Sequence, residues 1–273
     1  MKVLAVFTCF NRKEKTKTCI ETLVKGNPSC EFTFIAVDDN STDGTSDMLN
    51  EMKEQFSIYP VAGNGSLFYS GGMRIGMQYA LNNLGECFDY FMMLNDDVEF
   101  FDGCIEKMIK QSIRFDGAVI VGAMCNYAGA LSYGAVKYDK GIRYHAIQPK
   151  DCKIQADTFN ANCVLIPYRA FKKTGAIDEH YIHSLGDFDY GFELKRNGYR
   201  IFSSEEYVGV CQNNPSNNTS SDTRLSRIKR FKLKESPKGA PFKPWFYFLK
   251  KNFGFFTAVK GSITPYIRIL IGK

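Results

Sequence analysis

An apolar run that changes at once into acidic residues is the feature that most constrains the fold of this chain. Residues 90–94 read Tyr-Phe-Met-Met-Leu, and Asn95, Asp96 and Asp97 follow directly. An apolar run of this kind predicts a strand buried on both faces. Acidic residues at the carboxyl end of such a strand lie where open α/β sheets bind ligands. The alternative interpretation is a strand that ends in an ordinary polar turn, where Asn and Asp are common.

A second predicted strand, residues 32–37, ends in the same way. It is followed by Asp38 and Asp39, and then by turn residues that include Asp43, which we interpret as a helix cap. Strands and helical segments alternate over the first 120 residues, beginning with a strand at 2–8. This alternation predicts an α/β fold with a mostly parallel central sheet and helices on both faces.

The second half of the body has a different pattern. Residues 130–147 predict a hairpin, and residues 163–167 predict another apolar strand, so we expect a smaller mixed sheet that covers one side of the ligand cleft. Asp187 and Asp189 open a predicted helix that ends at Asn197-Gly198. An Asp at a helix start is favoured by the helix dipole, but two acids two residues apart cannot both serve one cap.

Glycines precede a helix predicted at about residues 73–84. Gly63, Gly65, Gly71 and Gly72 could allow a phosphate to approach the backbone, although a flexible loop explains them equally well. Neither the Walker pattern nor G-x-G-x-x-G after the first strand is present. Their absence argues against P-loop kinases and dinucleotide-dependent dehydrogenases.

The charge of the chain is unevenly distributed. The 273 residues carry a net charge of +6, but residues 224–273 contain thirteen Lys or Arg and one acid, Glu235. That segment therefore carries +12, and the remainder carries −6. We expect a basic aromatic helical tail at 223–273, joined by a polar linker at 213–222. The tail either packs its aromatic residues on the body or a second subunit, or lies on an anionic membrane, whereas the acidic body argues against nucleic acid.

The remaining composition is that of a globular protein. Hydrophobic residues make up 44% and charged residues 23%, and no apolar run is long enough for a membrane span. Nine cysteines occur without a C-x-x-C pair, which predicts reduced thiols in a cytoplasmic protein. The apolar part of the first residues is too short for a signal peptide, so we expect the chain in the cytoplasm or at the inner face of the cell membrane.

Four segments, in this order, resemble family 2 glycosyltransferases. Residues 37–45 read V-D-D-N-S-T-D-G-T, and residues 94–98, L-N-D-D-V, resemble the D-x-D metal motif of the family. Residues 64–76 resemble the aromatic-glycine segment of its rhamnosyl- and galactofuranosyl-transferase branch. Residues 186–199 resemble the segment that supplies the catalytic base.

This resemblance implies a GT-A fold over residues 1–212, a nucleotide-sugar donor and an inverting transfer. The nucleotide-sugar half would span 1–122, and the acceptor and catalytic half 123–212. The donor, a UDP- or dTDP-sugar, would be contacted by residues at the strand ends and in the glycine segment: Thr8, Asn11, Asp38, Asp39, Asn64, Gly71, Gly72 and Asp96. The resemblance places a divalent metal, Mg²⁺ or Mn²⁺, on Asn95 and Asp97, and a general base at Asp187 or Asp189.

Two departures from the family pattern affect these assignments. Asn95 replaces a carboxylate, and Gly186 replaces the acid that normally precedes the base. The late His that often binds the metal in the family is absent after Val208, where only Cys211 occurs, so His183 is the alternative ligand.

The chemistry of sugar transfer agrees with these residue types, because a cation stabilises the diphosphate leaving group and one carboxylate takes the acceptor proton. We expect a glycan or lipid-linked acceptor in cell-surface polysaccharide synthesis. The alternatives are a non-catalytic nucleotide-sugar-binding module and a sugar-phosphate nucleotidylyltransferase.

Overall fold

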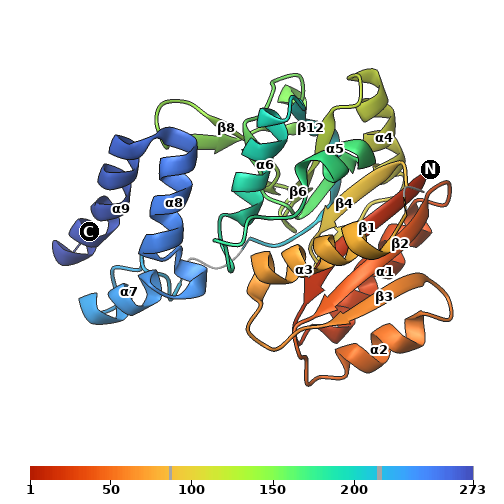
Figure 1. Cartoon of the computed structure of the whole chain (residues 1–273), viewed down its shortest axis with the longest axis horizontal. Coiled ribbons are helices and arrows are strands. Elements are labelled where there is room, and N and C mark those ends of the chain that lie inside the picture. The colour runs from red at the N-terminus through yellow and green to blue at the C-terminus, as the bar shows by residue number, and fades with distance from the viewer. Residues whose placement is uncertain (86–87, 214–216, 273) are drawn as a thin grey trace.

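A large, mostly parallel sheet forms the centre of the protein (Figure 1). The computed structural model describes residues 1–85, 88–213 and 217–272. Within these residues the main sheet has nine strands in the order β3-β2-β1-β4-β11-β6-β12-β5, with β7 paired to β6. They are β1 (Lys2–Cys9), β2 (Glu31–Asp38), β3 (Ser57–Ala62), β4 (Tyr90–Leu94), β5 (Glu99–Phe100), β6 (Val119–Cys125), β7 (Leu131–Tyr133), β11 (Cys163–Pro167) and β12 (Ile201–Val210).

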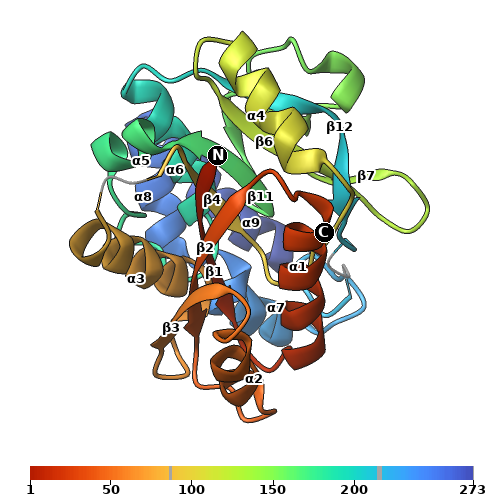
Figure 2. The ribbon, with the colours of Figure 1, turned by 90° about the vertical axis from the view of Figure 1, so that its right-hand side faces the viewer.

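Helices cover both faces of this sheet (Figure 2). They are α1 (Lys13–Gly26), α2 (Thr45–Met52), α3 (Phe68–Asn83), α4 (Cys104–Arg114), α5 (Tyr168–Thr174) and α6 (Gly186–Arg196). Alternate residues of a strand point to opposite faces, so β1 contributes Val3, Ala5 and Phe7 to one core and Leu4 and Val6 to the other. The first core is covered by α1, α2 and α4, and the second by α3, α5 and α6.

One antiparallel strand divides the main sheet. Strand β11 pairs antiparallel with β4 on one side and with β6 on the other, whereas β1, β2, β3 and β4 are mutually parallel. A separate small sheet consists of β8 (Ala135–Tyr138), β9 (Tyr144–Ala146) and β10 (Thr158–Phe159). The expected mostly parallel α/β fold is therefore confirmed, but the small sheet is antiparallel rather than mixed.

The tail forms three helices at the end of the molecule away from β3 (Figure 1). They are α7 (Arg227–Lys234), α8 (Phe242–Phe253) and α9 (Phe255–Leu270), with a short 3-10 turn at η2 (Pro237–Gly239) between α7 and α8. A second 3-10 turn, η1 (Pro149–Asp151), lies in the body after β9. Phe248 of α8 is buried in the second core, so part of the aromatic tail packs on the body. Residues 214–216 of the expected polar linker lie outside the described residues.

Eight cysteines fall in the part of the chain that the structure describes, and all eight are free; Cys87 lies outside it. Over the same residues, no helix combines the length and the apolar character needed to span a membrane.

Helix α3 begins earlier than the sequence predicts. The expected start was near Met73, but the helix begins at Phe68, so Gly71 and Gly72 lie inside it rather than before it. A Cβ atom at Gly72 would lie 2.4 Å from Oγ1 of Thr8. The glycine is therefore required because α3 packs directly against β1, and the expectation of a glycine loop ahead of the helix is wrong at this point.

Candidate active site

The carboxyl ends of β1, β2 and β4 meet at one edge of the main sheet. Cys9, the last residue of β1, is in register with Asp38 of β2, and β1 is also parallel to β4. The negative charges of Asp96 and Asp38 both contribute to the raised pKa of the Cys9 thiol, after the larger effect of burial. The acidic residues that follow β2 and β4 are therefore neighbours, as expected for parallel strands.

The acid pair after β4 is bound by an arginine that follows β1. Nη1 of Arg12 lies 3.1 Å from Oδ1 of Asp96 and 2.9 Å from Oδ2 of Asp97. Asp96 is buried and also accepts a hydrogen bond from Oγ1 of Thr16 at 3.1 Å. Burial raises the pKa of Asp96 to about 6, although the charge of Arg12 acts in the opposite direction. Asp97 is less buried, with 23% of its side chain exposed, and is the carboxylate that a ligand can reach.

The donor atoms around this pair suit a divalent cation. Oδ1 of Asn95 is buried without a hydrogen-bond partner among the described residues, as expected of an oxygen that serves an absent donor or cation. Sγ of Cys211 lies 3.7 Å from Oδ1 of Asp97, and burial raises the pKa of this thiol to about 12. Carboxylate and amide oxygens are the ligands that Mg²⁺ and Mn²⁺ prefer.

His183 is not assembled with these residues. Its Nδ1 atom lies 3.5 Å from the backbone nitrogen of Tyr69, and its ring meets that of Phe68 edge-on. Burial lowers the pKa of His183 to about 4, and the nearby Lys238 acts in the same direction. Over the described ranges, no group of three His, Cys, Asp or Glu side chains is arranged to hold a metal ion. The structure therefore does not join His183 to Asp96 and Asp97 in one metal-holding group.

The acids after β2 organise the loops of the site. Oδ1 of Asp38 accepts a hydrogen bond from the backbone nitrogen of Ser41. The carboxylate of Asp39 accepts three, from the backbone nitrogens of Gly65, Leu67 and Phe68 at 2.8–3.1 Å. Asp39 therefore fixes the loop that leads into α3.

The side-chain amides of two asparagines that were expected to contact the donor also hold loops. Oδ1 of Asn11 accepts from the backbone nitrogen of Thr42 at 2.7 Å. Oδ1 of Asn64 accepts from the backbone nitrogen of Ser66 at 3.0 Å. The N–H group of Gly71, which the sequence suggested for phosphate binding, instead donates to the carbonyl oxygen of Ile182 at 3.0 Å.

The two candidate bases at the start of α6 have different surroundings. Asp187 accepts hydrogen bonds from the backbone nitrogens of Phe188 at 2.9 Å and Ala161 at 3.3 Å, but burial outweighs them and raises its pKa to about 6. The Tyr69 hydroxyl lies 3.5 Å from the carbonyl oxygen of the same Ala161. Asp189 is almost fully buried on the tail side, where its carboxylate is 2.7 Å from Nζ of Lys251.

Close packing explains why residue 186 is glycine. A Cβ atom at Gly186 would lie 2.4 Å from Oγ of Ser70 and 2.9 Å from Cγ2 of Ile177. An acidic side chain could not be placed there unless α3 moved, because real Cβ atoms do not approach so closely. The departure at Gly186 therefore reflects the contact between α3 and α6.

Several residues of this site were not identified from the sequence. Arg12 binds the acid pair, Thr16 supports it, and Lys251 and Asn252 bind Asp189. The position of Arg12 just after the first parallel strand is a signal that could have identified it, because that strand neighbours β4. No local pattern connects Lys251 to Asp189, which lies 62 residues earlier.

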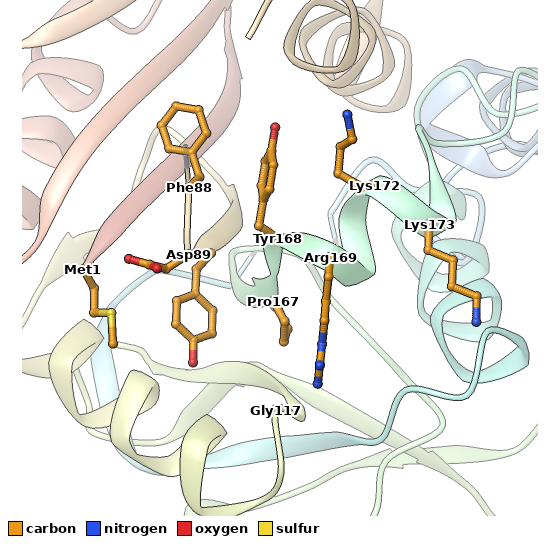
Figure 3. Close-up of a pocket in the computed structure, with 10 residues that line it drawn as sticks. Met1, Phe88, Asp89, Gly117, Pro167, Tyr168, Arg169, Lys172 and Lys173 are labelled. Carbon is orange, nitrogen blue, oxygen red and sulfur yellow. The ribbon is translucent and has the colours of Figure 1, made fainter. Parts of the chain in front are cut away.

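A separate cavity of about 780 Å³ opens at the opposite edge of the sheet (Figure 3). It is lined by residues that precede or begin strands, including Met1, Asp89 and Tyr90, and by the α5 residues Arg169 and Lys172. Figure 3 shows Arg169 extending toward Gly117. Since ligands of open α/β sheets bind at the carboxyl ends of the strands, this cavity is distinct from the candidate active site.

Comparisons with known proteins agree with this geometry. TarS of S. aureus, residues 1–349, in complex with UDP-GlcNAc has a similar structure, with 14% identity, a TM-score of 0.61, and coverage of 99% of this chain and 80% of that one. The same protein without the ligand gives 13% identity and a TM-score of 0.60, with 98% and 81% coverage.

The mannosyltransferase PcManGT of Pyrobaculum calidifontis, in complex with GDP-Man and Mn²⁺, gives 12% identity and a TM-score of 0.56, with 99% and 73% coverage. These likenesses show a shared GT-A type of fold. No curated protein matches the chain. Residues 5–175, more than half of the sequence, match the family described as glycosyl transferase family 2, and the chain belongs to that family.

Proposed function

We propose that this protein is an inverting glycosyltransferase that moves a sugar from a nucleotide-diphosphate donor to a hydroxyl group of a glycan or lipid-linked acceptor. The observation that carries the proposal is Asp187, a carboxylate with a pKa raised to about 6 at the start of α6. A base with a pKa near the working pH removes a proton efficiently while remaining ionised. Family membership supports transfer of a sugar, and Asp187 supports the way in which the acceptor is activated.

In the proposed reaction Asp187 takes the proton of the acceptor hydroxyl. The acceptor oxygen forms a bond to the anomeric carbon while the bond from that carbon to the diphosphate oxygen breaks. The electron pair leaves with the nucleoside diphosphate, so one displacement inverts the anomeric centre and no covalent enzyme intermediate is needed. Asp189 is assigned a positioning role, because its carboxylate is bound by Lys251 and Asn252.

The donor is assigned to the carboxyl ends of β1, β2 and β4. Asp38 and Asp96, both buried, give these strand ends their acidic character, and Asp39 and Asn11 hold the surrounding loops. Similar structures hold UDP-GlcNAc or GDP-Man, which supports a nucleotide-sugar donor here. A UDP- or dTDP-sugar, with rhamnose or galactofuranose as the sugar, remains the prediction from residues 64–76.

Asp97 and Asn95 are the residues that would hold a divalent cation, because their oxygens suit it and that of Asn95 is unpartnered. The cation supplies charge stabilisation for the leaving diphosphate. Arg12 contributes fixed positive charge beside the same carboxylates and keeps Asp96 ionised more readily than burial alone would allow. A neighbouring structure holds Mn²⁺, which is consistent with this assignment.

We assign a membrane contact to α9. This contact supports the proposal that the enzyme acts in the cytoplasm at the inner face of the cell membrane. That location in turn supports a role in polysaccharide synthesis. Phe256, Val259, Ile263 and Ile267 recur at three- or four-residue spacing and are all exposed, Phe256 by 88%. Lysine and arginine residues accompany this apolar stripe on the tail. An exposed apolar helix face with basic flanks suits the interface of an anionic membrane.

The test is a thermal-shift panel of nucleotide diphosphates and nucleotide sugars, each with and without Mn²⁺, on the full chain and on Asp97→Ala. A ligand that binds the native state raises the melting temperature by mass action. We expect one UDP- or dTDP-sugar to give a shift that increases with Mn²⁺ and that loses its Mn²⁺ dependence in the variant. Absence of a shift with every donor would contradict a nucleotide-sugar site at these strand ends, and a shift unchanged in Asp97→Ala would remove Asp97 from the metal site.

A further inference from the structure

A cavity of about 1040 Å³ lies between the tail and the β8–β9 hairpin. Most of its walls come from the hairpin around Ile142, from helix α7 with the η2 turn, and from helix α9. Ser220 and Ser221, which precede α7, and Trp245 of α8 complete the lining. A Cβ atom at Gly261 of α9 would lie 3.7 Å from Cδ1 of Ile142, which shows that the hairpin packs against α9. The volume is in the range of small-molecule sites.

The lining of this cavity is strongly basic. It contains Arg143 from the hairpin, Arg230 and Lys234 from α7, and Lys260 and Arg268 from α9, and the described lining residues include no Asp or Glu. Arg143, Lys260 and Arg268 are exposed, and none of the three forms an ion pair with another described residue. Cations that converge from three segments without acids repel one another unless an anion lies between them.

Lys234 is a buried cation in the lining of the cavity. It is 5% exposed, and Nζ donates to the carbonyl oxygens of Gly239, at 3.0 Å, and Ala240. Burial lowers its pKa, and only the charge of Glu235 opposes this effect. Glu235 itself is bound by the Tyr266 hydroxyl. Its ammonium also lies 5.8 Å from the centre of the Tyr266 ring, but it forms no ion pair with a described residue. A buried ammonium group without an ion-pair partner costs free energy, which a bound anion would offset.

The cavity is connected to the segment that carries Asp187. Arg143 immediately precedes Tyr144, and the ring of Tyr144 packs against that of Phe188 at 5.7 Å. On the other wall, the carbonyl oxygen of Lys238 accepts a hydrogen bond from Oγ of Ser184 at 3.4 Å. Residues 184–188 are therefore touched from both sides of the basic cavity.

We propose that this cavity binds a phosphate or diphosphate group, and that this group belongs to the acceptor of the transfer reaction. Arg and Lys side chains from several segments match the charge and the several oxygens of such a group better than a single carboxylate would. The second clause rests on the proposed transferase activity, whereas the first does not. A phospholipid headgroup has the same chemistry and is the alternative source.

The test uses a matched pair of double variants of the full chain. Lys260→Gln with Arg268→Gln removes two exposed cations that line the cavity, and Lys243→Gln with Lys250→Gln removes two exposed tail cations that do not. Both keep their fold, because none of the four side chains is buried. The probe is inorganic diphosphate, titrated calorimetrically in metal-free buffer without donor, and a parallel arm uses vesicles that contain phosphatidic acid.

We expect the cavity variant to bind diphosphate about tenfold more weakly, or worse, and the control variant to bind as the parent does. A loss confined to diphosphate supports a site for a phosphate or diphosphate group outside a bilayer, as the acceptor assignment requires, and an equal loss for vesicles assigns the site to a membrane lipid. Equal weakening in both variants, or no change in the cavity variant, would overturn the proposal. Because no donor is present, this result is independent of whether the protein transfers a sugar.

Discussion

Nζ of Lys251 on α8 lies 2.7 Å from Oδ2 of Asp189 on α6, with Asp189 only 1% exposed. The same ammonium lies 3.0 Å from Asp178 and 2.8 Å from Glu193, and these three acids raise its pKa despite burial. The tail is therefore fastened to the body at the helix that carries Asp187. This ion pair distinguishes the two aspartates of α6, because Asp189 is bound by Lys251 whereas Asp187 accepts hydrogen bonds only from backbone nitrogens among the described residues.

Replacing Lys251 by Met should destabilise the protein by about 3 kcal/mol, because a nearly buried carboxylate loses its nearest cation and keeps only the 3.9 Å contact with Arg196. The matched control is Lys250→Met, since Lys250 is exposed and lies next to it in sequence. We expect the control to stay within about 0.5 kcal/mol of the parent. Urea unfolding measures both, and equal stability of the two variants would show that the ion pair contributes nothing.

Asp187→Asn should abolish most turnover while leaving donor binding intact. In the parent, kcat/KM should rise with pH and level off above a pKa of about 6, because only the ionised carboxylate accepts the proton. Rates measured from pH 5 to pH 8 test this, with donor binding followed by calorimetry. Undiminished turnover in the variant would assign the base to another residue.

The variant Asp187→Asn should lose activity but gain stability. The pKa of Asp187 is about 6 in the folded protein and near its ordinary value in the unfolded chain, so the folded state binds more protons between these values. Stability contributed by the protonated group is therefore lost as pH rises through about 6. Asp187→Asn should gain stability relative to the parent between pH 4 and pH 7, by at most about 3 kcal/mol. Melting curves at the two pH values measure this gain.

Arg12→Gln should make donor binding depend more strongly on metal. Without Arg12, Asp96 and Asp97 face the donor diphosphate with uncompensated charge, so binding without Mn²⁺ should fall about tenfold while binding with Mn²⁺ changes little. Lys17→Gln is the control, because Lys17 is exposed on α1 and makes only a long contact with Glu21. Similar losses with and without Mn²⁺ would mean that Arg12 acts on the donor directly.

Ile263→Gln combined with Ile267→Gln should reduce binding to anionic vesicles at least fivefold without lowering the melting temperature. Both side chains are about half exposed on α9, so their removal changes the surface rather than the core. A control with Ile113→Gln and Ile154→Gln changes two similarly exposed residues of the body. Vesicle co-sedimentation decides between them, and equal binding by the two double variants would exclude α9 as the contact.

The sequence was sufficient where local patterns determine structure. Strands β2 and β4 were predicted from their apolar runs, together with the acids at their carboxyl ends. The structure brings both strand ends to one edge of the sheet. The start of α3 could not be predicted, because glycine disfavours helices and the sequence has two in a row at Gly71 and Gly72. The reason for a glycine at position 72 is the close approach of α3 to Thr8 on β1, which no local pattern shows.

The surroundings of the two aspartates in α6 also depend on distant residues. Their spacing left Asp187 and Asp189 equivalent, and the contact that separates them comes from Lys251, far along the chain. The partners of Arg12, Asp96 and Asp97, follow it by 84 and 85 residues, and only its position after the first parallel strand places it near them. Long-range ion pairs have no local sequence pattern. The strand ends that form this site could therefore be predicted, whereas the cations that bind its acids could not be predicted from local patterns.

The fastening of α8 to α6 also sets an order of events during synthesis. Lys251 is made 62 residues after Asp189, which at about 5–20 residues per second is a delay of roughly 3–12 seconds. During that interval the nascent body carries a carboxylate destined for burial while its cation has not yet been translated. The charge balance around Asp189 is therefore completed only when the tail has been made, and a chain truncated between residues 189 and 251 would lack this ion pair.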